Sequence, residues 1–168
     1  MNDSEPKYPI PNWNQIQQRL FRYERILEIS QELAVMFDHQ ALLRVIVNAA
    51  SELTDSEASS ILLLDASTGE LRFEMASNMA SSDLTNIVVP IDGSIAGWVV
   101  THGEVRLIQD SAADPGYSRQ VEDATRVRTS NLLAVPLKSR RGQVIGVLEA
   151  LNKRGPTQYQ DDDIKMLT

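Results

Sequence analysis

The chain has 168 residues, a formal net charge of −7 and no cysteine. Without cysteine there can be no disulfide, thiolate metal site, thiol nucleophile or cofactor attached through sulfur, and this composition favours a cytoplasmic protein. The acidic balance and the lack of a long basic block argue against a nucleic-acid partner. No apolar run approaches the roughly 20 residues that cross a bilayer, so we expect no membrane partner either.

The N-terminal part predicts a lead-in followed by one long helix. Residues 1–12 contain three prolines, and we expect them to be extended or disordered. Residues 13–37 are predicted to be helical because apolar side chains recur at alternating steps of four and three, the spacing of a coiled-coil seam. This stripe comprises Ile16, Leu20, Tyr23, Leu27, Ser30, Ala34 and Phe37. A second stripe begins at Ile26, so we expect one stripe to pack on its own domain and the other on a partner helix.

The remaining elements predict an α+β fold with a mainly antiparallel sheet. Asp38 is a predicted N-cap for a helix over 39–54 with one broad apolar face. The pattern then changes to strands joined by tight turns. The predicted hairpins are 59–65 with 71–77 and 131–139 with 144–152, the single strands are 86–91 and 105–109, and a last helix covers 161–168. The hairpin strands are almost continuously apolar, so helices or loops should cover both faces of the sheet.

The stretch from Asp92 to Asp110 contains two glycines and a tryptophan, and two interpretations compete for it. A phosphate-binding loop needs a Gly-Lys-Ser/Thr sequence, and no lysine is present here. The better interpretation is a short helix over 94–101, capped by Asp92 or Ser94 and ended by Gly103. Gly97 would then allow a neighbouring backbone to approach closely. The side chains spaced to pack on one side of this helix are Ile95, Trp98 and Val99.

Five segments in this order resemble the GAF domains of signalling proteins such as bacterial sensor histidine kinases. They are "SILLLD", "IAGWVVTHGEVRLIQD", "LLAVPL", "IGVLEALNK" and "YQDDDIKML". The resemblance, which runs from Leu27 to Thr168, implies a profilin-like antiparallel sheet of about five to six strands. It further implies N- and C-terminal helices on one face, and a short helix and loops closing a small-molecule pocket on the other.

The resemblance also implies a domain organisation. Residues 13–37 would be a signalling and dimerisation helix, since the terminal helices of GAF domains commonly pair across a homodimer and continue into an output domain of the same chain. Residues 38–168 would be the GAF domain itself. The sequence stops within a helical pattern, so we expect the C-terminal helix to be truncated.

The candidate ligand-binding residues come from two arguments. Ser60, Asn131 and Glu149 are polar residues inside apolar strands, so each must either bond within the core or contact a ligand. For Glu149 we expect an ion pair with Arg126 or Arg128. Asp110 follows a strand and either caps the turn after it or faces the pocket. By resemblance, Ile95 and Trp98 form part of the pocket wall, and Tyr117 is either a lid residue or part of a mobile surface turn.

The segment after the last strand partly matches the NKFDE signature of cyclic-nucleotide-binding GAF domains. Asn152, Lys153 and Asp163 fit the signature and Tyr159 stands at its aromatic position, but Ile164 replaces the final acidic residue. The structural interpretation is that Lys153 and Asp163 pair and tie the last strand to the last helix, adding little stability if they are only partly covered. The signature also occurs in GAF domains with other ligands, so it does not establish cyclic nucleotide binding.

These observations favour a regulatory protein over an enzyme. A covalent bilin and the thiol chemistry of GAF-type methionine sulfoxide reductases both require cysteine, and the two histidines, His39 and His102, form no haem or metal site with ligand spacing. We expect a non-catalytic, cytoplasmic small-molecule sensor that signals to a histidine kinase, nucleotide cyclase or transcription activator through dimeric terminal helices. The alternative is a dimerisation and relay module with a collapsed, ligand-free pocket.

Overall fold

The computed structural model describes residues 13–34, 38–79, 87–114, 122, 127–155 and 158–168. The chain separates into two compact units, Met1–Val35 and Met36–Thr168, which are described one at a time. The predicted lead-in, residues 1–12, lies outside the described residues.

The described part of the first unit is the helix α1 (Trp13–Ala34), 22 residues long. Arg25 and Glu28 form an ion pair of 3.1 Å along it, at the spacing that places side chains on one face. Five of its large apolar side chains are exposed, including three members of the predicted stripe, whereas Ile29 is buried. The exposed ones are Trp13, Leu20, Phe21, Tyr23 and Leu27.

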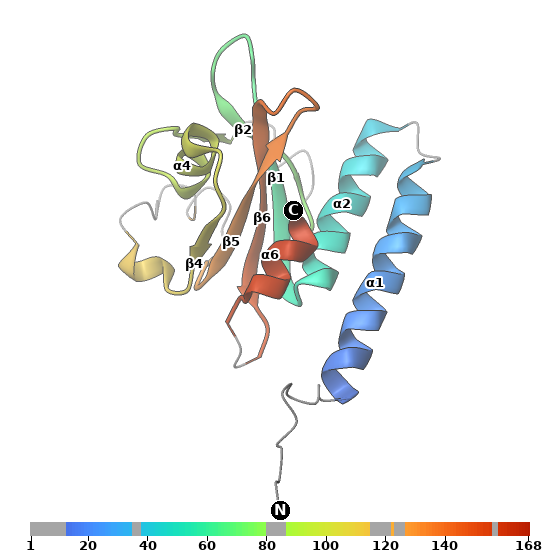
Figure 1. Ribbon diagram of the computed structural model, residues 1–168. Helices are drawn as coiled ribbons and strands as arrows, with labels where there is room; N and C mark the ends of the chain where they lie inside the picture. Colours follow the sequence, from blue (N-terminus) through green and yellow to red (C-terminus); the bar gives the residue numbers. More distant parts are fainter. Residues whose placement is uncertain (1–12, 35–37, 80–86, 115–121, 123–126, 156–157) are drawn as a thin grey trace, which may run out of the picture. The chain divides into compact units, whose positions relative to one another are not determined.

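The second unit is built on a six-stranded antiparallel sheet in the order β3-β2-β1-β6-β5-β4 (Figure 1). The strands are β1 (Ser56–Leu64), β2 (Leu71–Ala76), β3 (Val88–Val89), β4 (Arg106–Ile108), β5 (Leu132–Lys138) and β6 (Val144–Lys153). Both predicted hairpins are confirmed, and their inner strands β1 and β6 pair at the centre of the sheet.

Two strands differ most from their predicted bounds. β1 begins three residues early, at Ser56, because it pairs with β6 as far as Lys153. β3 is short because Pro90 follows it and has no N–H to donate to the sheet. The sheet order explains both, since a central strand is paired along its length and an edge strand is not.

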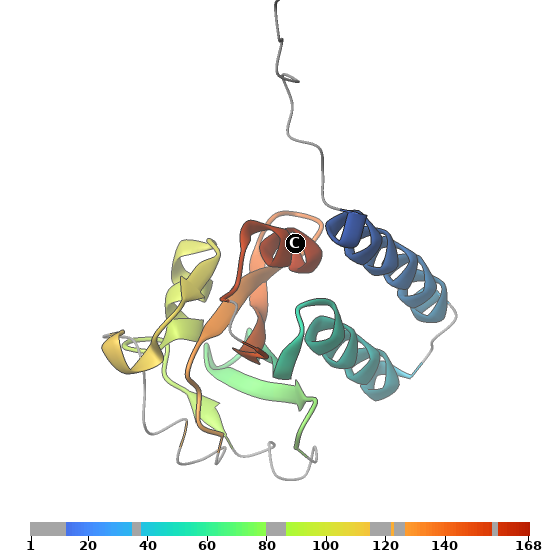
Figure 2. The same cartoon turned by 90° about the horizontal axis from the view of Figure 1, so that it is seen from below.

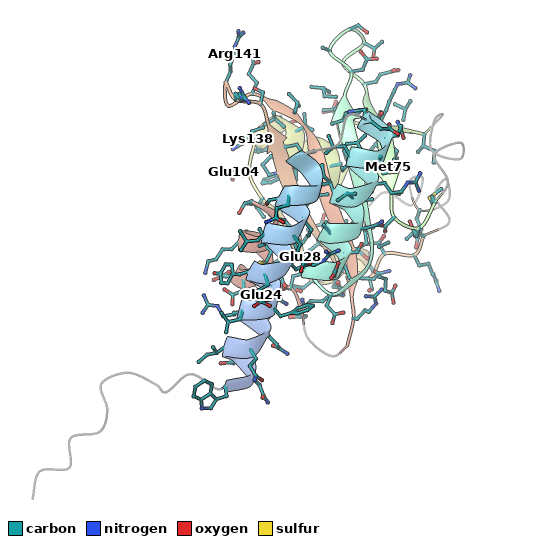
Figure 3. All side chains as sticks on the ribbon, turned by 90° about the vertical axis from the view of Figure 1, so that its right-hand side faces the viewer. Glu24, Glu28, Met75, Glu104, Lys138 and Arg141 are labelled. Atoms are coloured by element: carbon teal, nitrogen blue, oxygen red, sulfur yellow. The ribbon has the colours of Figure 1, made fainter. Side chains whose placement is uncertain are left out.

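The helices α2 (His39–Leu53) and α6 (Asp161–Leu167) cover one face of the sheet (Figure 2). Asp38 caps α2 as predicted, since its side chain accepts a hydrogen bond of 2.9 Å from Gln40 N. Met75, labelled in Figure 3, belongs to the core on this face. The buried members of this core are Leu43, Val47, Ala50, Ile61, Met75, Leu133, Val135, Leu148, Ala150 and Tyr159.

The short helix α4 (Ile95–His102) and the 3₁₀ turn η1 (Ser111–Ala113) lie on the opposite side of the sheet (Figure 1). The hydroxyl of Ser94 accepts a hydrogen bond of 2.9 Å from Gly97 N, and the helix ends at Gly103 with φ of 66°. A Cβ at Gly97 would overlap the backbone of Ile91, so this position requires the close approach that the sequence predicted. The short helix is therefore confirmed, one residue further along than expected.

Candidate functional site

A cavity of about 80 Å³ lies on the α4 side of the sheet. A single ordered water needs roughly 10–15 Å³ measured in this way, so the space suits several waters or one small molecule. Its described lining is mostly apolar and comes from the sheet, the residues after β2, the start of α4 and the segment before β5. The residues are Ala58, Ser59, Ser60, Leu62, Phe73, Ala76, Asn78, Met79, Val89, Ser94, Ile95, Ala96, Glu122, Val127, Thr129, Leu132, Glu149 and Leu151.

Ser60 and Glu149 meet in this lining at the centre of the sheet. They are direct partners in the pairing of β1 with β6, and the Ser60 hydroxyl donates a hydrogen bond of 3.0 Å to Glu149 Oε2. Alternation along β6 places Glu149 on the face that also carries Val147 and Leu151. The side chains of a polar pair thus share one wall of an otherwise apolar space.

Burial dominates the electrostatics of Glu149. The residue is 7% exposed, and removal from water raises the pKa of its carboxyl to about 7, although the hydrogen bond from Ser60 acts in the opposite direction. A carboxyl with this pKa changes its charge near neutral pH. It can bind a donor in either protonation state, as an acceptor pair or as a neutral acid.

The predicted ion pair of Glu149 with Arg128 is absent. Among the described residues, Ser60 is the hydrogen-bond partner of this carboxyl and no arginine lies within ion-pair distance. Arg128 is exposed, and its carbonyl accepts a hydrogen bond of 2.7 Å from the side chain of Asn152 at the end of β6. Arg126, the other predicted partner, lies outside the described residues.

The structure brings Ser60, Ile95 and Glu149 together around the cavity, whereas Trp98 is not in its described lining. Trp98 stacks on His102 with ring centroids 4.2 Å apart, and the guanidinium of Arg106 lies 5.0 Å from the tryptophan ring. The spacing of four residues on α4 places both rings on one face of the helix. Trp98 therefore joins α4 to β4.

Asp110 and Asn131 also make local contacts instead of lining the cavity. The Asp110 side chain accepts a hydrogen bond of 3.1 Å from Ala112 N and caps η1, which is the first of its two predicted roles. The Asn131 side chain accepts one of 2.9 Å from Lys153 N. Tyr117, the predicted lid residue, lies outside the described residues.

Sequence reasoning missed several lining residues. Ala58 and Leu62 share the face of Ser60 because they are two residues away on β1, so the strand period was a signal that could have found them. Glu122 is different, because it comes from a segment with no periodic pattern. Its presence in the lining adds a second carboxyl that no sequence pattern predicted.

The four residues of the NKFDE-like segment form a tie between β6, α6 and the end of α2. Lys153 Nζ lies 3.0 Å from Asp163 Oδ1 and donates a hydrogen bond of 2.8 Å to the carbonyl of Thr54. Asp163 Oδ2 accepts one of 2.9 Å from Gln160 N at the start of α6. The Lys153 and Asp163 side chains are only 7% and 3% exposed, so the pair is more deeply buried than the partly covered pair we expected.

Tyr159 and Asn152 complete this tie. The Tyr159 ring lies 5.4 Å from Lys153 Nζ, and its hydroxyl is 2.8 Å from Ser56 Oγ. Burial raises the pKa of Tyr159 well above its usual range, so the phenol stays neutral. Asn152 adopts a left-handed conformation, with φ of 56°, and its side-chain oxygen accepts a hydrogen bond of 2.8 Å from Ser130 N. None of the four residues belongs to the described lining of the cavity.

The described residues contain no group of three His, Asp or Glu side chains that could hold a metal ion. Both histidines are exposed, with His39 3.9 Å from Glu74 and His102 Nδ1 2.9 Å from the carbonyl of Trp98. None of the helices that the structure describes has the length and apolar character needed to span a membrane.

Comparison with protein families decides the classification. The model of the GAF domain matches residues 38–168. The chain belongs to the GAF domain family. GAF domains are in general regulatory domains of signalling proteins, and this chain shares their antiparallel sheet and flanking helices.

Individual GAF-containing proteins differ widely in what they do. The chain is 28% identical over 154 residues to the dual 3′,5′-cyclic-AMP and -GMP phosphodiesterase 11A of Takifugu rubripes, covering 86% of this chain but only 17% of that protein. The structure resembles the GAF domain of a phosphoenolpyruvate-protein phosphotransferase from Coxiella burnetii, with a TM-score of 0.77, 16% identity and coverage of 88% and 86% of the two chains.

A third similar protein is an enzyme in its own right. The free methionine-R-sulfoxide reductase of Neisseria meningitidis, solved with its substrate, has a TM-score of 0.72 and 21% identity, covering 95% of this chain and 86% of that one. At this level of identity the similarity shows the fold alone. The function of this GAF domain must therefore be argued from its own site.

Proposed function

We propose that this GAF domain is a non-catalytic, cytoplasmic sensor that binds a small molecule in the cavity of the α4 side and regulates an output domain of the same chain. The cavity carries the proposal, since it combines an apolar lining with a few convergent polar groups, as small-molecule sites do. The relative from Takifugu supports a regulatory place in a longer protein, because the matched region is a small part of its length.

Signal transmission would use the terminal helices. A ligand that binds one arrangement of the cavity walls more tightly shifts the domain toward it. β6 carries both Glu149 in the cavity and Lys153, which is tied to α6. The exposed apolar stripe of α1 suits a second copy of the same helix in a homodimer.

The native mass of freshly purified protein tests the sensor function. An excess of a few hundred daltons per chain over the denatured mass would mean that a small molecule is retained. An empty protein that also binds no small molecule in titrations would favour the second candidate, a ligand-free dimerisation and relay module. The exposed apolar side chains of α1 support that second candidate too, because a relay needs the dimer but not the ligand.

A cyclic nucleotide is not the ligand that we propose. It carries a phosphate anion, and the described lining of the cavity contains two carboxyls and no Lys, Arg or His. Calorimetric titration with cAMP and cGMP checks this, and we expect no heat of binding at millimolar ligand. Saturable binding of either nucleotide would contradict the argument from charge.

A further inference from the structure

The charged groups in the described lining of the cavity are all of one sign. Glu149 and Glu122 are the titratable residues of its described lining, and the lining residues of β2, β3, β5 and α4 carry no charge. The remaining polar groups are hydroxyls and one amide, from Ser59, Ser60, Asn78, Ser94 and Thr129. A ligand with positive charge would therefore meet attraction and no described opposing cation.

The backbone of Glu149 is held by strand pairing on both sides, so its carboxyl cannot move far to find a hydrogen-bond donor. Its backbone lies between two paired strands, opposite Ser60 of β1 and Ala134 of β5. Ser60 donates to Oε2, and the described residues supply no donor to Oε1. A largely buried carboxyl with a single neutral donor can accept further hydrogen bonds from a molecule in the cavity.

An ammonium group would supply further hydrogen-bond donors and a compensating charge to the Glu149 carboxyl. It offers up to three N–H donors and a positive charge, and charge-assisted hydrogen bonds to a carboxylate are about twice as strong as neutral ones. The apolar part of the same molecule would contact the apolar walls, among them Phe73, Ile95 and Leu132. An alcohol of the same shape would gain the apolar contacts but not the charge.

We propose that the cavity binds a small compound with a protonated primary or secondary amine on an apolar body, with the ammonium group against Glu149. This inference rests on the proposed sensor function and names the chemical class of its ligand.

Proton linkage gives the inference a second signature. An amine with a pKa near 10 stays protonated between pH 6 and 8, whereas Glu149, with a pKa of about 7, changes from mainly neutral to mainly ionised. The ammonium binds the ionised form, so its affinity should rise about tenfold from pH 6 to pH 8. Glu122 faces the same cavity, and the variant Glu122→Gln must keep this dependence if Glu149 is the group responsible.

The experiment compares n-butylamine, 1-butanol and butyrate, which differ mainly in the charge of one end. Binding to the intact protein is measured by nuclear magnetic resonance titration at pH 6, 7 and 8. We expect n-butylamine to bind at least tenfold more tightly than 1-butanol at pH 8, and butyrate not to bind. Equal binding of amine and alcohol, no binding of either, or affinity independent of pH would overturn the inference.

Two variants assign the effect to one carboxyl. Glu149→Gln should remove the preference for amine over alcohol, and the matched substitution of an exposed carboxyl, Glu104→Gln, should leave it unchanged. If Glu149→Gln does not fold, the pH series on the unaltered protein still decides. Retention of the preference in folded Glu149→Gln would overturn the inference.

The retained molecule separates this inference from the function on which it rests. Reductive methylation of the extracted compound adds about 28 Da to a primary amine and about 14 Da to a secondary one. A retained compound without such an amine would overturn the inference and leave the sensor function standing. An empty cavity together with no binding of any of the three compounds would count against both.

Discussion

Glu149 is held at the centre of the sheet with most of its surface removed from water, and this makes stability depend on pH. The pKa of its carboxyl is raised from 4.5 to about 7 in the folded protein, so between these values the folded chain holds a proton that the unfolded chain has lost. Unfolding then releases a proton, and a rise in pH lowers the free energy of unfolding until about pH 7.

Substitution of Glu149 by Gln removes the titrating group, and with it the fall in the free energy of unfolding as pH rises. We expect the free energy of unfolding of Glu149→Gln to match the unaltered protein near pH 4.5 and to exceed it by about 3 kcal/mol at pH 8. Urea denaturation at both pH values measures the difference, with the exposed Glu104→Gln as the control that should show none. A Gln variant that is less stable at pH 8 would mean that Glu149 forms a buried ion pair.

Lys153 illustrates the opposite situation, a buried charge whose partners are all in place. The variant Lys153→Met should lower the free energy of unfolding by about 3–5 kcal/mol, because it leaves the buried carboxylate of Asp163 without its cation. The double variant Lys153→Met/Asp163→Asn should lose less than the sum of the two single variants.

The exposed pair of Lys165 and Asp162 on α6 provides the control for this prediction. Its atoms are 3.4 Å apart and its side chains are 70% and 45% exposed, so Lys165→Met should leave the urea midpoint almost unchanged. If Lys153→Met also left the urea midpoint almost unchanged, the buried pair would stabilise the protein no more than an exposed ion pair does.

Single residues also show where the sequence was sufficient. Their place inside apolar strands was enough to single out Ser60 and Glu149 as candidates, and both line the cavity. That they face each other was not predicted, because the pairing of β1 with β6 joins two hairpins and neither turn sets it. The sequence could not show that Asn131 and Asp110 would bond to nearby backbone groups, since a polar residue in an apolar context predicts a partner but not which one. Glu122 lies in a segment without periodic apolar residues, so its place in the lining could not be predicted.

At the scale of the element, α4 depends on one residue without a side chain. Gly97 lies against the backbone of Ile91, and backbone cannot move aside as a flexible side chain can. We expect Gly97→Ala to lower the free energy of unfolding by about 1–3 kcal/mol or to displace α4 from the cavity wall. Urea denaturation measures the first effect, and loss of ligand or probe binding reports the second.

Gly69 is the matched control for this substitution. It lies in the turn between β1 and β2 with no atom within 4 Å of an added Cβ, although its φ of 73° favours glycine. Gly69→Ala should therefore cost about 1 kcal/mol from backbone strain alone and leave binding unchanged. Equal effects at the two glycines would argue against a tight contact at Gly97.

The elements themselves were the part of the fold most open to prediction. The helix over 39–54, the short helix and both hairpins followed from caps, period and turns, which are local in the sequence. The edge strand β3 was predicted too long, since Ile87 and Ile91 extend the apolar run on both sides without taking part in the strand. The order of strands in the sheet is not local, so these signals could not supply it.

At the scale of the whole molecule, we predict that α1 holds a homodimer together. Leu20 and Leu27 are seven residues apart, so they fall on the same seam of a coiled coil. Removal of residues 1–25, or the double variant Leu20→Ser/Leu27→Ser, should lower the sedimentation mass from a dimer to a monomer. The double variant Gln17→Ser/Glu24→Ser, with the same spacing at exposed polar positions, should remain dimeric, and an unchanged mass after the truncation would refute the seam.

The pairing of β1 with β6 has a consequence for how the domain is made. Ser60 and Glu149, which touch across the centre of the sheet, are 89 residues apart in the chain. Such long-range pairing is slow to form because a long loop must close before the contact is gained. During synthesis, β1 and β2 leave the ribosome well before β6 and expose their apolar faces until it arrives. The wall that carries Glu149 is thus completed only when the last strand is inserted, so the nascent domain gains its small-molecule site and its protection from aggregation in the same late step.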